Sequence, residues 1–127
     1  MGMKRSLLLW APAAIVAGII FFASSLPGQS LPSVAIWSFD KVVHAAVYAV
    51  LGLLVAMPLE RLKVIQRRTA IVIVAAMVVT AYGISDELHQ RFTPGRSPDV
   101  YDVIADAIGG VLGAWAWVGF RRKRAGD

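Results

Sequence analysis

The 127-residue chain contains no cysteine. This absence excludes a disulfide-stapled scaffold and any metal site built from thiolates. Charged residues are also scarce: they make up 17% of the chain, whereas a soluble domain carries about 25%. With 57% hydrophobic residues, a chain this small has too little polar surface to cover a soluble globule. The composition therefore excludes an ordinary soluble enzyme domain, a coiled coil and a disordered protein.

The chain contains four long apolar stretches that are nearly free of charged residues. They cover about residues 7–26, 42–59, 64–84 and 100–120. About 20 helical residues cross a hydrocarbon core of about 30 Å, and backbone groups in lipid must be paired within the segment, so the stretches should be helices. The sequence therefore predicts an all-α fold: one domain over residues 1–127 that forms an integral membrane four-helix bundle.

The basic residues predict the orientation of this bundle. Ten of the thirteen lie at the N-terminus, between the second and third stretches, or at the C-terminus. They are Lys4, Arg5, Arg61, Lys63, Arg67, Arg68, Arg121, Arg122, Lys123 and Arg124. The positive-inside rule then places both termini in the cytoplasm, N-in/C-in. Beside a membrane helix, the basic C-terminal run indicates contact with lipid headgroups rather than with nucleic acid, so the lipid bilayer is the expected partner. A cleaved signal peptide is disfavoured, because the first apolar stretch is longer than the 7–15 residues of a signal.

The acidic residues gather at the opposite, outer side. Six of the eight lie at the outer face or in the outer half of a helix, and we call these six the acidic cluster: Asp40, Asp86, Glu87, Asp99, Asp102 and Asp106. Asp40, His44 and Tyr48 are spaced four apart, so they share one helix face. An unpaired carboxylate at the centre of a bilayer costs roughly 2.5–3.5 kcal/mol. We therefore expect these side chains to face one another, within about 8 Å of each other or of His44.

Glycines continue the acidic face of the fourth stretch. Gly109 and Gly113 are spaced four apart, and small residues at this spacing allow two helix backbones to approach closely. The sequence predicts that another helix crosses the fourth one at these glycines.

The acidic cluster has three interpretations. In the first it is a structural salt-bridge network with the outer bases Lys41, Arg91 and Arg96, although three acids would remain unpaired. In the second it is a site for a divalent metal cation or a polar substrate, because close carboxylates do not all stay ionised without a cation and some must be protonated or metal-bound. The third is a proton path. For a functional site, the candidates are Asp40, His44, Glu87 and Asp102 as catalytic residues, Asp86, Asp99 and Asp106 as metal ligands, and Tyr48, Gln90 and Arg96 as substrate-binding residues, with Arg96 suited to a phosphate.

Several motifs resemble the VanZ-like family, small bacterial membrane proteins named for a teicoplanin-resistance protein. The motifs are Phe22-Ala23-Ser24-Ser25-Leu26-Pro27, Asp40-Lys41-x-x-His44 with Tyr48 and Gly52, Asp86-Glu87-x-x-Gln90-x-Phe92-x-Pro94-Gly95-Arg96, and Asp99-x-x-Asp102. The chain departs from the family at Asp106, where an asparagine is common. The resemblance implies a multi-pass protein of the bacterial cytoplasmic (inner) membrane, linked in some relatives to the cell envelope or to glycopeptide tolerance. It implies no particular reaction.

Two functions therefore stand open. One is a membrane-embedded site, facing the outer leaflet, that binds or acts on a lipid-linked polar envelope substrate. The other is a non-enzymatic accessory protein whose outer charges hold the fold together. The sequence decides neither whether the chain is an enzyme nor its oligomeric state.

Overall fold

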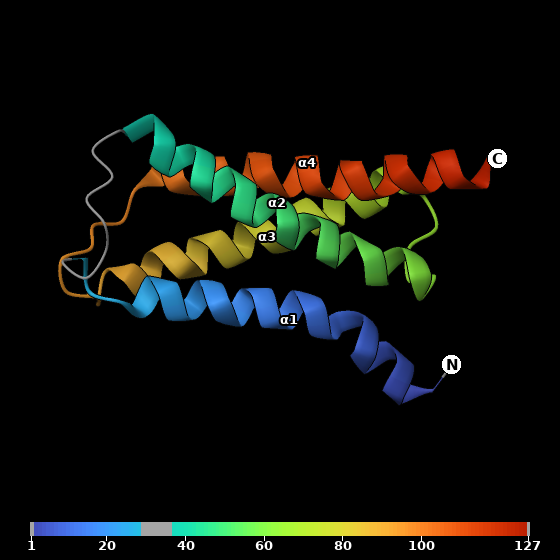
Figure 1. Cartoon of the computed structure of the whole chain (residues 1–127), viewed down its shortest axis with the longest axis horizontal. Helices are drawn as coiled ribbons and strands as arrows, with labels where there is room; N and C mark the ends of the chain where they lie inside the picture. The colour runs from blue at the N-terminus through green and yellow to red at the C-terminus, as the bar shows by residue number, and fades with distance from the viewer. Residues whose placement is uncertain (1, 29–36, 127) are drawn as a thin grey trace.

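The computed structural model describes residues 2–28 and 37–126. Within them the chain forms four α-helices: α1 (Met3–Ser25), α2 (Trp37–Arg61), α3 (Arg68–Gln90) and α4 (Val100–Ala125) (Figure 1). By length and composition, all four are suited to cross a membrane. The prediction of an all-α fold with four helices long and apolar enough to span a membrane is confirmed, whereas the orientation N-in/C-in stays a prediction.

The helices extend several residues beyond their predicted ranges at Met3, Trp37, Gln90 and Ala125, whereas α3 begins later than predicted. The third helix begins at Arg68, four residues after the predicted start. The chain turns at Lys63, whose φ is 54°. The amide of Lys63 donates to the carbonyl of Glu60 at 2.9 Å, and the amide of Val64 donates to that of Leu59 at 3.1 Å. The residues after α2 therefore satisfy its last carbonyls and cannot also start the next helix.

The interface between α2 and α4 is the closest in the bundle. A Cβ built on Gly109 would overlap the backbone of Ala45, and a Cβ on Gly113 would overlap that of Ala49. The prediction that another helix crosses α4 at these glycines is confirmed, and the helix is α2 of the same chain.

The first helix lies outside this pair. It packs against α2 and α3, and its N-terminal part bends away from the bundle (Figure 1). Pro12 lies in this part of α1, and a proline inside a helix removes a backbone hydrogen bond and kinks it.

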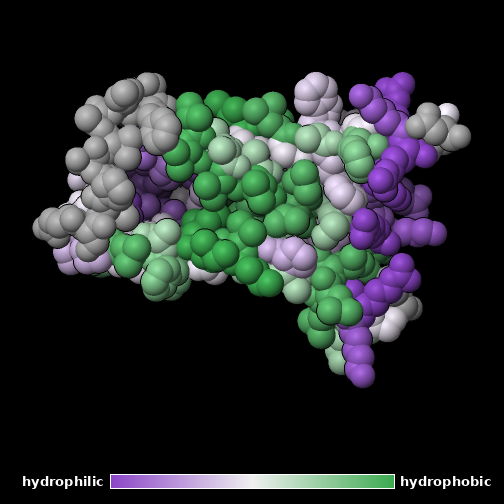
Figure 2. Space-filling model, in the orientation of Figure 1, coloured by the Kyte–Doolittle hydropathy of each residue, from purple (hydrophilic) through white to green (hydrophobic). Residues whose placement is uncertain are grey.

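The two ends of the bundle differ in chemistry. Apolar side chains cover most of the middle, and a hydrophilic surface gathers at the end that holds both termini (Figure 2). We call this the basic end, since it carries Arg61, Arg121 and Arg122. At the other end, the acidic end, α2 and α4 begin and α1 and α3 finish. The acidic cluster therefore lies where four helix termini meet.

Candidate functional site

The side chain of Lys41 joins α2 to α4 at the acidic end. Its ammonium donates to Asp99 Oδ2 at 2.6 Å, to Asp40 Oδ2 at 3.3 Å and also to Asp102 Oδ1. This bonding lowers the pKa of the Asp99 carboxyl below its usual range, and the bond that Asp99 accepts from the amide of Tyr101 acts in the same direction. Sequence reasoning treated Lys41 only as a counter-charge. Its place next to Asp40, at the start of a membrane helix, was the signal for a larger role.

His44 lies one turn further along α2, between two carboxylates of α4. Its Nδ1 is 2.9 Å from Asp106 Oδ1, and its Nε2 is 3.7 Å from Asp102 Oδ2. Asp106 is fully buried. A Cβ on Gly83 would collide with the Asp106 carboxylate, so a glycine at this position of α3 makes room for it. The extra acid of this chain is therefore a direct partner of the histidine.

Helix α3 supplies the remaining two acids. The hydroxyl of Tyr48 donates to Asp86 Oδ2 at 3.3 Å, and Glu87 Oε2 accepts from the amide of Asp99 at 2.8 Å. Each of these carboxylates is buried, yet Asp86 Oδ1 and Glu87 Oε1 have no hydrogen-bond partner within the described residues, and the same holds for Asp106 Oδ2. A buried carboxylate oxygen without a partner is costly. These three oxygens are therefore buried acceptors that the described residues leave unsatisfied.

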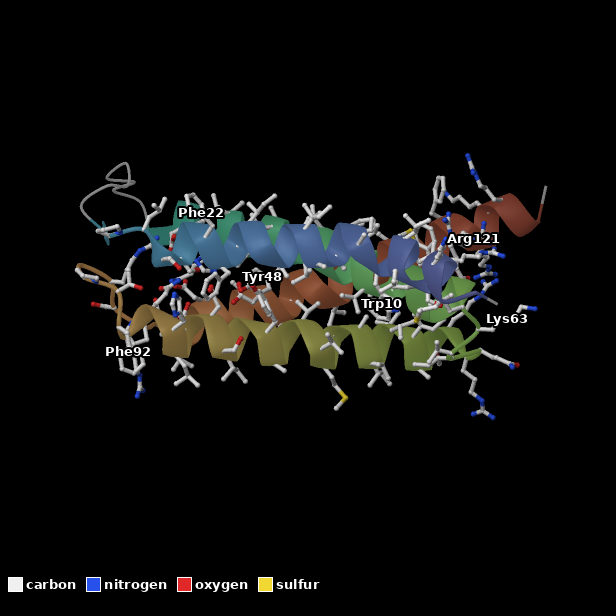
Figure 3. The ribbon with its side chains drawn as sticks, turned by 90° about the horizontal axis from the view of Figure 1, so that it is seen from below. Trp10, Phe22, Tyr48, Lys63, Phe92 and Arg121 are labelled. Atoms are coloured by element: carbon white, nitrogen blue, oxygen red, sulfur yellow. The ribbon has the colours of Figure 1, made fainter. Side chains whose placement is uncertain are left out.

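These contacts confirm that the polar stripes of α2 and α4 converge. Ligand atoms of Asp40, His44 and Asp102 all lie within 4.8 Å of one another. On α3, Glu87 reaches the backbone of Asp99 and Asp86 reaches Tyr48. Nitrogen and oxygen atoms crowd the same end of the bundle, beyond Tyr48 (Figure 3). Their catalytic, substrate-binding and metal-binding roles remain predictions.

Gln90 and Arg96 serve a second contact, between α1 and the segment after α3. The Arg96 guanidinium donates to the carbonyls of Leu26 at 3.2 Å and Ala23 at 3.0 Å, which satisfies the C-terminal end of α1. The amide of Gln90 donates to Ser24 Oγ at 3.4 Å. Two motifs that are about 70 residues apart, one ending α1 and one following α3, thus meet in space.

Close backbone contact between the same segments depends on two glycines. Gly95 has a φ of 73°, in the left-handed region that favours glycine. The amide of Gly28 donates to the carbonyl of Pro94 at 2.9 Å, and a Cβ on Gly28 would overlap Gly95. The loop that carries Arg96 is therefore held directly against the end of α1.

A cleft of about 210 Å³ opens beside the acidic cluster. Side chains of α1 and α2 form its apolar wall, which includes Ile19, Val43 and Val47. Its polar lining comes from α1, α2, α3 and the loop before α4: Ser24, His44, Tyr48, Asp86, Gln90 and Arg96. All three predicted substrate-binding residues, Tyr48, Gln90 and Arg96, lie on this cleft.

His89 has a partner on α1. Its Nε2 lies 2.9 Å from the hydroxyl oxygen of Ser25, and its ring stacks on Phe21 with centroids 4.7 Å apart. The Ser25 hydroxyl donates to the carbonyl of Phe21 at 2.7 Å, the usual bond of a serine late in a membrane helix.

The donor atoms of Asp40, His44 and Asp102 suit the binding of a divalent cation more than nucleophilic catalysis by a serine or cysteine side chain. One imidazole nitrogen and two carboxylates are ligands that several divalent metals accept. On the cleft side, the guanidinium of Arg96 and the amide of Gln90 are suited to bind phosphate or sugar oxygens.

Comparison with known proteins identifies the family of the chain. No curated protein and no solved structure matches the chain. The sequence profile of the family described as VanZ/LLP1 matches residues 8–121, nearly the whole chain and all four helices. The chain belongs to the VanZ/LLP1 family.

Proposed function

We propose that the chain binds the polar headgroup of a lipid-linked envelope substrate in the cleft between α1 and α2, at the outer leaflet of the bacterial inner membrane. The observation that supports this proposal is the composition of the cleft. Part of its lining is apolar, with side chains exposed on the outside of the bundle, and the rest is polar.

The apolar wall suits a lipid chain. Ile19 is 61% exposed and Val47 is 38% exposed on helices that are suited to span a membrane. In a bilayer, such side chains contact acyl or isoprenoid chains rather than water. A lipid lying along this wall would bring its headgroup to His44 and Arg96, which line the same cleft.

The polar end has donors left for a headgroup. A guanidinium carries five N–H donors, and Arg96 uses Nε and one terminal nitrogen for the carbonyls of α1. The remaining donors suit phosphate oxygens, which guanidinium groups bind in a bidentate fork. Catalytic roles for Asp40, His44, Glu87 and Asp102 would require a proton transfer to or from the bound headgroup, and headgroup binding alone does not need one.

The proposed location follows from the charges and the family. The basic end should face the cytoplasm by the positive-inside rule, which directs the cleft to the outer leaflet. The resemblance to VanZ-like proteins implies, for some relatives, a link to the cell envelope or to glycopeptide tolerance.

A structural role for the acidic cluster is the second candidate. It is favoured by Lys41, whose bonds to Asp99 and Asp102 tie the start of α2 to the start of α4. Under this alternative, loss of these bonds lowers stability, and nothing binds in the cleft.

Lipid binding distinguishes the two candidates. We would reconstitute the purified chain and measure retention of a polyprenyl phosphate against phosphatidylcholine by native mass spectrometry. Val47→Trp fills the cleft, whereas Val78→Trp adds the same bulk on α3, where Val78 is 48% exposed and lies outside the cleft. We expect Val47→Trp to weaken retention at least tenfold and Val78→Trp to leave it unchanged. The proposal would be overturned if the unmodified chain retained both lipids equally. It would also be overturned if Val47→Trp and Val78→Trp retained the polyprenyl phosphate equally.

A cell assay connects binding to the envelope. A deletion strain would be complemented with the unmodified chain, with Val47→Trp and with Val78→Trp, and its susceptibility to teicoplanin measured. We expect only Val47→Trp to behave like the deletion. If all three chains complement equally, the cleft has no part in glycopeptide tolerance.

A further inference from the structure

The geometry points to a divalent-cation centre formed by Asp40, His44 and Asp102, with Asp106 as the residue that orients the imidazole. The inference goes beyond headgroup binding and does not depend on it. It rests on ligand spacing, on the hydrogen bond behind His44 and on the charge of the surrounding carboxylates.

The three donor atoms are close to coordination distances. One ligand atom from each residue lies within 4.8 Å of the others, and His44 Nε2 is 3.7 Å from Asp102 Oδ2. Donors placed about 2.1 Å from one cation lie about 3.0–4.2 Å apart. Asp40 is exposed at the surface of the bundle, and Asp40 and Asp102 also contact the ammonium of Lys41, so a bound cation would share these carboxylates with Lys41.

The hydrogen bond of His44 selects the tautomer that a metal needs. An ionised carboxylate only accepts hydrogen bonds, so with Asp106 ionised the contact of 2.9 Å between Nδ1 and Asp106 Oδ1 is a bond that the Nδ1–H of His44 donates. In the neutral form of this ring Nε2 carries the lone pair, and its distance of 3.7 Å to Asp102 Oδ2 is too long for a hydrogen bond. Metal-binding histidines commonly donate their second ring N–H to a carboxylate in this way.

The carboxyl groups of the acidic cluster also favour a cation here, because close carboxylates do not all stay ionised without one. Six carboxylates form the acidic cluster, and its basic contacts within the described residues are Lys41 and His44. Asp86, Glu87 and Asp106 are each at most 5% exposed, and each has one buried oxygen without a hydrogen-bond partner. Lys41 balances one negative charge. A divalent cation at His44 would balance two more without any added protein group.

The ligand set indicates which cations fit. One imidazole with two carboxylates suits Zn²⁺, Mn²⁺ or Fe²⁺ better than Ca²⁺, which prefers six to eight oxygens. Three protein ligands leave positions open for water or another oxygen ligand. Because His44 also lines the cleft, such open positions would lie beside the proposed headgroup site.

Metal binding to the purified full chain tests the centre. The protein would be stripped with EDTA, dialysed and titrated with Zn²⁺ or Mn²⁺, with bound metal measured by elemental analysis and Co²⁺ absorption recorded in parallel. We expect about one tight ion per chain. His44→Gln and Asp40→Asn should each weaken binding at least 100-fold, and Asp106→Asn 10- to 100-fold. Glu60→Gln, on the same helix at the basic end, should bind as the unmodified chain does.

The outcomes separate this inference from folding and from headgroup binding. Asp40 is exposed, so Asp40→Asn should keep its helical circular dichroism even if His44→Gln does not fold. No stoichiometric metal, or equal metal affinity in Asp40→Asn and Glu60→Gln, would overturn the centre. Polyprenyl phosphate retention would be measured on the same stripped samples. Retention without metal binding would refute the centre alone, and metal binding without retention would refute only the headgroup site.

Discussion

Replacing Gly113 with alanine tests how closely α2 and α4 must approach. In the structure, a Cβ at this position would overlap the carbonyl group of Ala49 on α2. Gly119 lies six residues further along the same helix, and a Cβ there would meet nothing within 4 Å. The two glycines therefore form a matched pair: the same substitution in one helix, with and without an opposing backbone.

The size of the effect follows from comparing the two variants. A glycine replaced by alanine inside a helix gains about 0.8–1.0 kcal/mol of helix propensity, and this gain is common to both positions. Forcing an extra carbon into a packed interface costs typically 1–3 kcal/mol. The opposing atoms are backbone rather than a flexible side chain, so the helices themselves must separate. We expect Gly113→Ala to be less stable than Gly119→Ala by about 1–3 kcal/mol.

Unfolding in mixed detergent micelles measures this difference. The free energy of unfolding would be taken from the loss of helical circular dichroism as the denaturing detergent is increased, with both variants prepared in parallel. Gly109→Ala, which faces the backbone of Ala45, should resemble Gly113→Ala. If Gly113→Ala were as stable as Gly119→Ala, α2 and α4 would not be in backbone contact, and the convergence of their polar side chains would lose its structural basis.

Three further predictions concern the acidic end and the topology. Lys41→Gln leaves Asp102 buried without its cation and should destabilise the fold by about 3 kcal/mol; adding Asp102→Asn should restore part of that loss in the same unfolding assay. The pKa of Asp99 is lowered in the folded chain, so the stability that its carboxylate contributes is full above the unfolded pKa of about 3.9 and is lost as the pH falls through the folded pKa. Asp99→Asn should therefore flatten the decline of the free energy of unfolding at acid pH. An unchanged slope would contradict the contact between Asp99 and Lys41. In this cysteine-free chain, Ser97→Cys should react with an impermeant maleimide on intact cells and Gly2→Cys should not; the reverse pattern would overturn N-in/C-in.

The sequence by itself determined the four apolar helices and the separation of acidic and basic residues to their opposite ends. Hydropathy over about 20 residues is a local property, and lipid forces each such segment to satisfy its own backbone as a helix. The segregation of acids and bases to opposite ends is equally local, because it follows from which helix ends carry them. The close crossing at Gly109 and Gly113 was also readable, since only small residues allow backbones to touch.

The later start of α3 needed the structure. Hydropathy alone extended the third helix back to residue 64, whereas hydrogen bonds after Lys63 close the end of α2. Such a turn is fixed by the backbone conformation of a few residues. Hydropathy averaged over a window of about 20 residues does not detect it.

Only the tertiary structure decided which charges meet. Lys41 bonds carboxylates that are 58 and 61 residues away in the chain, and Arg96 is directed to carbonyls of α1 rather than to the nearby Asp99. Spacing along a helix shows which side chains share a face, but not how that helix is rotated against its neighbours. Here the rotation is set by glycines that bring α2 onto α4, and this packing places His44 between Asp102 and Asp106.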